Sequence, residues 1–192
     1  MHPLLKRVSS LASLLTVAVI VSCSDDSKPS DNDRKTPKPE LINAFFMEAY
    51  YAGGIEPKWM DFDDSDDDGV LEPTYSSLGL GKGTQFRFEL WGFGFRDSNG
   101  NWTTAPIPGR MDDHLFCFEV TNGVLISNGY PDSDLDSNGK PTGLSSLWTT
   151  SSVPKTGSIK ITLYHQPKTK TGDCDVVESV VDFEVVLPIE IF

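Results

Sequence analysis

The side chains in this sequence that are best suited to metal chemistry are those of two histidines. His114 follows Asp112 and Asp113 at the start of an apolar segment, and His165 ends another apolar segment. Alternate residues of a strand share a face, so both imidazoles are expected on the apolar side of their strands, at one rim of the domain. Imidazole together with carboxylate suits zinc and other transition metals. The sequence therefore predicts a metal or ligand site made of these four residues, with strand-end hydrogen bonding as the alternative.

A second candidate site is an acidic loop. Its carboxylates, Asp64, Asp66, Asp68 and Glu72, lie on either side of Gly69. Calcium takes about six to eight oxygen ligands, and clustered acids repel one another unless a cation lies between them. We expect a calcium site here, with a solvated acidic turn as the alternative.

A similar acidic run precedes Gly139. It contains Asp132, Asp134, Asp136 and Asn138, and no acidic residue follows it closely. Asp and Asn side chains accept hydrogen bonds from nearby backbone groups, which favours a turn over an ion site.

No catalytic arrangement is visible. The sequence contains no glycine-rich phosphate loop after a strand, no nucleophile elbow and no HExxH helix, so we expect a protein that is not an enzyme. Four tryptophans, at positions 59, 91, 102 and 148, could include a sugar-stacking platform, although packing is the commoner role of tryptophan in a compact β domain.

Strands must position these groups. Alternating or continuous apolar segments predict strands at residues 41–48, 55–62, 85–95, 101–104, 115–120, 124–127, 144–150, 158–165 and 180–187. The Asn122-Gly123 pair predicts a hairpin between the fifth and sixth of them. In the last, the alternation puts Val181 and Phe183 on one face and Asp182 on the other. The spacing predicts an all-β domain over residues 41–192, a two-sheet, immunoglobulin-like sandwich.

The N-terminal residues have the features of an export signal. In residues 1–22, Lys6 and Arg7 precede an apolar run too short to span a membrane. The IVSC segment that ends at Cys23 resembles a bacterial lipobox, so Cys23 is expected to be acylated, for example with palmitate, and to anchor the protein in the membrane. Residues 23–40 are charged and rich in proline, which predicts a disordered tether.

Cysteine content and charge limit the function further. Cys117 and Cys174 remain besides the lipidated cysteine, and an even pair in an exported protein predicts a disulfide. The chain has 28 acidic and 16 basic residues, a net charge of −12. This charge excludes the basic surface that nucleic-acid binding needs, and it leaves the lipid as the means of membrane attachment.

The C-terminal third resembles a family of small Bacteroidetes lipoproteins often found beside TonB-dependent receptors. The motifs are DLDSNGKPTGL at 134–144, WTT at 148–150, LYHQP at 163–167 and VDFEV at 181–185. The acidic segments FDDSDDDG at 62–69 and DDHLF at 112–116 also fit the family pattern. Tyr164 stands where the family has arginine, and a loop containing Cys174 replaces its Gly-Glu-Thr.

The resemblance and the CSDD segment at 23–26, which resembles the surface-export signal of such lipoproteins, imply an outer-membrane location facing the exterior. We therefore expect a non-enzymatic module that binds a ligand or partner, as an accessory to a TonB-dependent receptor. A calcium-stabilised structural or adhesive module is the alternative, and a hydrolase is the least favoured interpretation.

Overall fold

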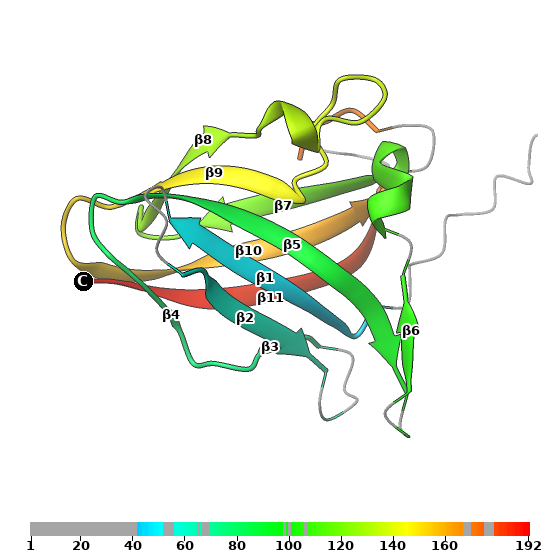
Figure 1. Ribbon diagram of the computed structural model, residues 1–192, viewed down its shortest axis with the longest axis horizontal. Coiled ribbons are helices and arrows are strands. Elements are labelled where there is room, and N and C mark those ends of the chain that lie inside the picture. Colours follow the sequence, from blue (N-terminus) through cyan, green and yellow to red (C-terminus); the bar gives the residue numbers. More distant parts are fainter. Residues whose placement is uncertain are drawn as a thin grey trace, which may run out of the picture. The chain divides into compact units, whose positions relative to one another are not determined.

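The computed structural model describes residues 42–51, 56–64, 66, 70–97, 99, 101–105, 107–166, 170–174 and 179–192. These residues form eleven strands, arranged in two sheets that pack face to face, and two short 3₁₀ helices (Figure 1). The predicted all-β, two-sheet sandwich is confirmed. The signal and tether predicted for residues 1–40 lie outside the described residues. Among those described, no helix is long and apolar enough to cross a membrane.

The larger sheet has seven strands in the order β3-β2-β1-β5-β9-β8, and β6 pairs with the far end of β5. Its strands are β1 (Ala44–Tyr51), β2 (Lys58–Asp63), β3 (Glu72–Pro73), β5 (Gln85–Arg96), β6 (Trp102–Thr104), β8 (Leu125–Gly129) and β9 (Ser145–Thr150). Between β5 and β6 the Asp97 carboxylate accepts hydrogen bonds from the backbone N–H groups of Asn99 and Asn101.

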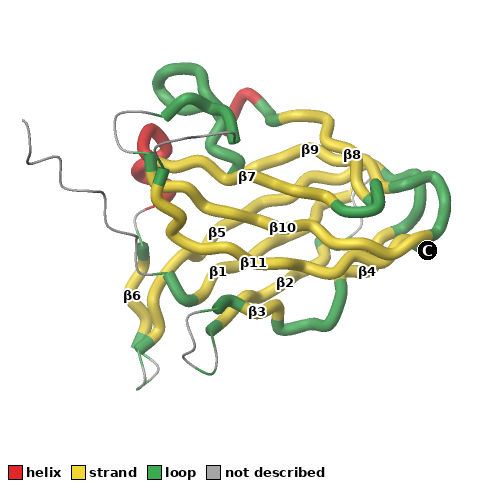
Figure 2. Tube along the Cα trace, turned by 180° about the vertical axis from the view of Figure 1, so that it is seen from behind, coloured by secondary structure: helices red, strands yellow, loops and turns green. Residues whose placement is uncertain are grey.

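The smaller sheet has the order β4-β11-β10-β7 and faces the viewer in Figure 2. Its strands are β4 (Leu78–Leu80), β7 (His114–Val120), β10 (Lys155–His165) and β11 (Val180–Ile191). All pairs are antiparallel except β4 with β11. The 3₁₀ helix η1 (Ile107–Asp113) leads directly into β7, and η2 (Asp132–Asp134) lies between β8 and β9.

Alternating apolar side chains from the two sheets fill the core. At one end the core is aromatic: the Phe45 ring stacks on Phe62 at 4.4 Å and on Phe183 at 4.9 Å, and Phe93 lies 5.3 Å from Phe116. Aromatic pairs of this kind stabilise a core by about 0.5–1.5 kcal/mol beyond the area they bury. These ring contacts join β1, β2 and β5 of the larger sheet to β7 and β11 of the smaller sheet.

The hairpin predicted at Asn122-Gly123 is wrong in its pairing. Both residues have positive φ, 54° and 58°, as a tight turn requires. However, β7 before the turn pairs with β10, whereas β8 after it pairs with β9 in the other sheet. Val124 is fully buried where the chain passes from the smaller sheet to the larger one.

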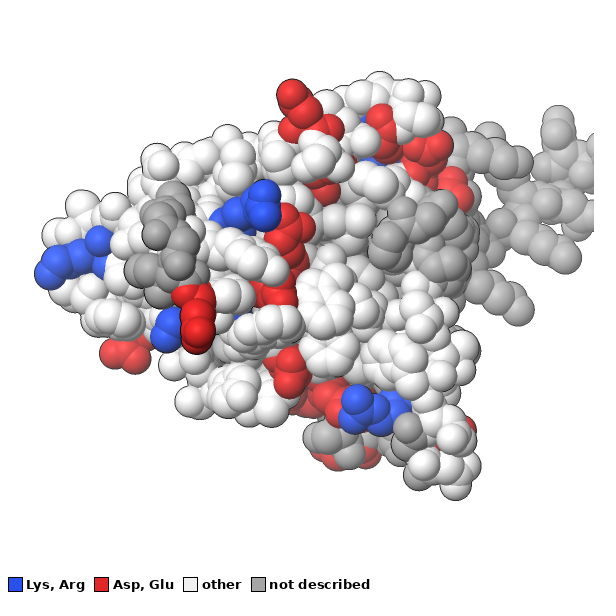
Figure 3. All heavy atoms as spheres, viewed as in Figure 1, with Lys and Arg blue, Asp and Glu red and all other residues white. Residues whose placement is uncertain are grey.

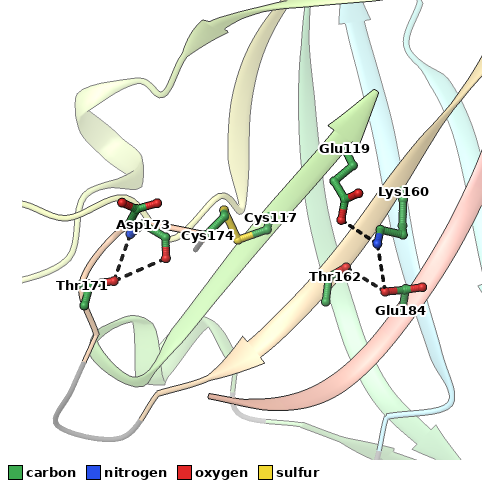
Figure 4. The surroundings of a disulfide bond; sticks show 8 residues. All are labelled: Cys117, Glu119, Lys160, Thr162, Thr171, Asp173, Cys174 and Glu184. Atoms are coloured by element: carbon green, nitrogen blue, oxygen red, sulfur yellow. Dashed lines mark hydrogen bonds and ion pairs between the residues drawn. A yellow bond between two sulfur atoms is a disulfide. The ribbon is translucent and has the colours of Figure 1, made fainter. Parts of the chain in front are cut away.

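The predicted disulfide is present. Cys117, on the outer side of β7, is bonded to Cys174, and the bridge closes a loop with a sequence separation of 57 (Figure 4). It attaches the segment 170–174 to the smaller sheet. Beside it, the Lys160 ammonium lies between the carboxylates of Glu119 and Glu184 on the same outer face.

Candidate metal centre

The two histidines meet at one end of the smaller sheet. His114 is the first residue of β7, His165 is the last residue of β10, and the two face each other in the antiparallel register. Their ring centroids are 4.7 Å apart. Both side chains are buried on the inner face, as the alternation of their strands predicted.

The third member of the cluster is Asp182, which comes from β11. Strand alternation predicts that its side chain points outward, and this prediction is wrong. Leu163 pairs with Phe183 and Tyr164 pairs with Val181, so Asp182 is an extra residue in a β-bulge. A bulge shifts the phase of the strand by one residue. Consequently the Asp182 side chain is fully buried, while Val181 is 44% exposed.

The bulge brings the carboxylate between the imidazoles. Nε2 of His114 is 3.5 Å from Oδ2 of Asp182, and Nδ1 of His165 is 3.8 Å from Oδ1 of the same residue. The three ligand atoms lie within 4.8 Å of one another. A tetrahedral ion with bonds of about 2.1 Å needs its ligand atoms about 3.4 Å apart. Side-chain rotations that bring the three ligand atoms closer together by about an ångström would therefore satisfy that geometry.

Of the two acids expected beside the histidines, Asp112 is bonded to a different part of the chain. The Asp112 carboxylate accepts hydrogen bonds from the backbone N–H and the hydroxyl of Ser137, which ties η1 to the turn after η2. Asp113 contributes its backbone carbonyl, which accepts a 2.6 Å hydrogen bond from the N–H of Gln166. This bond closes the chain over the end of β10. The carboxylate that lies between the two imidazoles is that of Asp182, which the sequence analysis did not assign to the site.

The second acidic run forms the hydrogen-bonded turn that was favoured for it. Asp134 is buried and its carboxylate accepts three backbone N–H bonds, from Thr142, Gly143 and Ser145. Burial raises the pKa of Asp134 even against these donors. Oδ1 of Asp136 accepts the N–H groups of Asn138 and Lys140.

A lysine ammonium lies beside this turn. Nζ of Lys170 lies 3.1 Å from Oδ2 of Asp136 and donates to the carbonyl of Met111 at 2.8 Å. The side chain of Lys170 is 3% exposed and that of Asp136 is fully buried. Burial lowers the pKa of Lys170 despite the opposing effect of Asp136. The protein thus supplies its own cation here.

The predicted calcium loop is described only in part. Asp68 lies outside the described residues, whereas Asp64, Asp66 and Glu72 lie within them. Glu72 stands opposite Asp63 in the β2–β3 pair, so the two ends of the acidic loop are adjacent.

No family model, curated protein or solved structure matches the chain.

Proposed function

We propose that this protein is a lipid-anchored, non-enzymatic binding module of the outer membrane, facing the exterior, that holds a transition-metal ion at the centre formed by His114, His165 and Asp182. The observation that carries the proposal is the convergence of two imidazoles and one carboxylate, from three neighbouring strands, within 4.8 Å. Two histidines and a carboxylate suit zinc and other divalent transition ions.

Burial of the centre supports binding over catalysis. The side chains of His114 and Asp182 are fully buried, and that of His165 is 7% exposed. A catalytic metal keeps an open position for water or substrate. Side chains packed inside a sheet end are better suited to holding an ion than to presenting it to a substrate.

The location rests on the sequence. The lipobox-like segment before Cys23 supports acylation, and the motifs of the C-terminal third support a role as an accessory to a TonB-dependent receptor. Mass spectrometry of the membrane-extracted protein should find a lipid-modified peptide that begins at Cys23. A mature chain that begins at another residue would contradict the anchor.

Calorimetric titration with Zn²⁺ tests the metal proposal. We expect one ion per chain, and Asp182→Asn should weaken binding by at least about 100-fold, because changes even in groups that only support the ligands cost about 10- to 100-fold. Glu184→Gln is the matched control, since Glu184 lies on the same strand but pairs with Lys160 on the outer face. Equal binding by the two variants, or no binding by the native protein, would return the cluster to a structural role.

A calcium-stabilised structural or adhesive module is the second candidate. The pairing of β2 with β3 favours it, because the cross-strand pair of Asp63 and Glu72 brings acidic side chains from both ends of the loop together. The Asp63 carboxylate is paired with the Arg96 guanidinium at 3.1 Å. A bound cation would therefore relieve the repulsion among the loop carboxylates themselves, Asp64, Asp66, Asp68 and Glu72.

A further inference from the structure

The outer face of the larger sheet carries a group of exposed aromatic rings. Trp59, Trp91 and Trp102 are 52%, 40% and 38% exposed, and Phe46 lies among them. These four residues, here called the aromatic platform, come from β2, β5, β6 and β1 respectively. The Phe46 ring is 4.9 Å from Trp91 and 6.4 Å from Trp102, and Trp59 stands edge-on to Trp91 at 80°. The rings of Phe46, Trp91 and Trp102 are thus tilted against one another, and the Trp59 ring stands edge-on beside them.

Two glycines of β5 let the rings of Phe46 and Trp102 lie against that strand. A Cβ atom at Gly92 would come within 2.4 Å of the Phe46 ring, and one at Gly94 within 2.4 Å of the Trp102 ring. Gly92 also has φ of +64°, which side-chain-bearing residues rarely adopt. The WGFGF segment therefore provides the space in which two rings lie close to the backbone. The Arg96 guanidinium lies over the Trp102 ring, 5.8 Å from its centroid.

Next to the aromatic platform, on the same face of the sheet, polar side chains form a network of ion pairs and hydrogen bonds. Arg87 Nε lies 2.7 Å from Oε1 of Glu89, which also accepts a 3.0 Å hydrogen bond from Ser145. On the neighbouring strand the Tyr50 hydroxyl donates to the Glu48 carboxylate, and the Arg87 guanidinium lies 5.5 Å from the Tyr50 ring centroid. Glu48 stands opposite Glu89 in the register and opposite Trp59 on its other side, so this network borders the platform directly.

A hollow of about 400 Å³ follows the network. It is lined by Tyr50, Arg87, Asn128 and Trp148 among others. Figure 3 views this side of the molecule, where acidic and basic groups form a band down the face and uncharged side chains lie on both sides of it. The hollow adjoins the charged network through Tyr50 and Arg87, which belong to both.

We infer that this face binds a neutral polysaccharide. One side of a pyranose ring presents C–H groups that pack on the electron-rich face of an aromatic ring, and its hydroxyls need paired donors and acceptors at the edge. The platform supplies the ring faces, and Arg87, Glu89 and Asn128 supply donors and acceptors. The net charge of −12 disfavours an anionic polymer.

A protein partner fits this surface less well. A protein interface would have to remove the Arg87–Glu89 pair from water, which costs free energy unless every remaining donor and acceptor is satisfied. A polysaccharide leaves much of the face hydrated and hydrogen-bonds to the charged groups through its hydroxyls. The inference does not depend on the metal centre, which lies inside the end of the other sheet.

Affinity electrophoresis of the full-length, detergent-extracted protein tests this inference. The gels would contain galactomannan, xyloglucan or glycogen as neutral polymers, and polygalacturonate as the anionic one. We expect at least one neutral polymer to retard the native protein and polygalacturonate not to do so. Trp91→Ala and Trp59→Ala should each weaken the retarding interaction by at least about tenfold, which corresponds to about 1.4 kcal/mol.

Phe192→Ala is the matched control, because Phe192 is 63% exposed and lies beside Gly79 of the smaller sheet. The Phe192→Ala variant should migrate as the native protein does. The melting temperatures of all variants should lie within a few degrees of that of the native protein. Retardation that survives the Trp91→Ala/Trp59→Ala double substitution overturns the inference, and so does the absence of retardation by all three neutral polymers. Concentration-dependent dimerisation that the double substitution abolishes would assign the face to a second copy of the chain and would also overturn it.

Discussion

Replacing Lys170 by methionine should lower the free energy of unfolding. The size of the loss follows from the groups that surround the Lys170 ammonium. The substitution keeps an unbranched apolar side chain that is one atom shorter, and it removes the ammonium with its charge. It leaves the fully buried Asp136 carboxylate without its 3.1 Å ion-pair partner and the Met111 carbonyl without a 2.8 Å donor.

Breaking a buried ion pair on one side costs about 3–5 kcal/mol. Two backbone N–H groups still bind Oδ1 of Asp136, so the cost should lie near the lower end, at about 3 kcal/mol. In a domain of this size each kcal/mol corresponds to about 2–4 °C, which predicts a fall in Tm of about 6–12 °C.

Urea unfolding followed by tryptophan fluorescence measures the loss. Lys160→Met is the matched control, since the Lys160 side chain is 29% exposed and its pairs with Glu119 and Glu184 lie on the surface. Exposed pairs contribute about 1 kcal/mol or less. Adding Asp136→Asn to Lys170→Met should restore part of the stability, because Oδ1 is retained and the stranded charge is gone. Equal losses for the two Lys→Met variants, or no recovery in the double variant, would refute the reasoning.

Three further predictions concern the bridge, the acidic loop and the turn. Replacing Cys117 and Cys174 by alanine should lower stability by about 4 kcal/mol, from the chain entropy of the loop they close, as measured by urea unfolding. Millimolar calcium should raise the Tm above its value in EDTA, and Asp66→Asn/Asp68→Asn should abolish that difference; equal melting of the native protein in both buffers would leave a solvated turn. Burial opposes ionisation of Asp136, but backbone N–H donors and the Lys170 ammonium hold its pKa below the usual range. Its stabilising contribution is therefore present above about pH 4 and is lost as the pH falls through the lowered pKa, so the stability difference from Asp136→Asn should shrink in acid.

Strand alternation was sufficient to predict the sandwich and the inward direction of both histidines. His165 continues a face of buried residues through Leu163, and burial of one face determines register because a one-residue slip would expose all of them. The pairing of β10 with β11 follows from the same pattern.

The remaining site residues depend on contacts that alternation does not encode. Asp182 turns inward only because a bulge at the start of β11 shifts its phase, and bulges leave no periodic signal in one sequence. Lys170 lies in an irregular segment, so nothing local predicts that it reaches Asp136, 34 positions earlier. The Asn122-Gly123 turn was predictable, but a turn does not specify the sheet that the next strand joins.

A crystal structure of the zinc-loaded protein tests most directly whether His114, His165 and Asp182 hold a metal ion. Data collected on both sides of the zinc absorption edge locate the ion without any assumption about its ligands. We predict one anomalous peak within about 2.1 Å of Nε2 of His114, Nδ1 of His165 and an Asp182 oxygen. A map without a peak at the end of the smaller sheet, with the Asp182 carboxylate bonded only to the two imidazoles, would contradict the account.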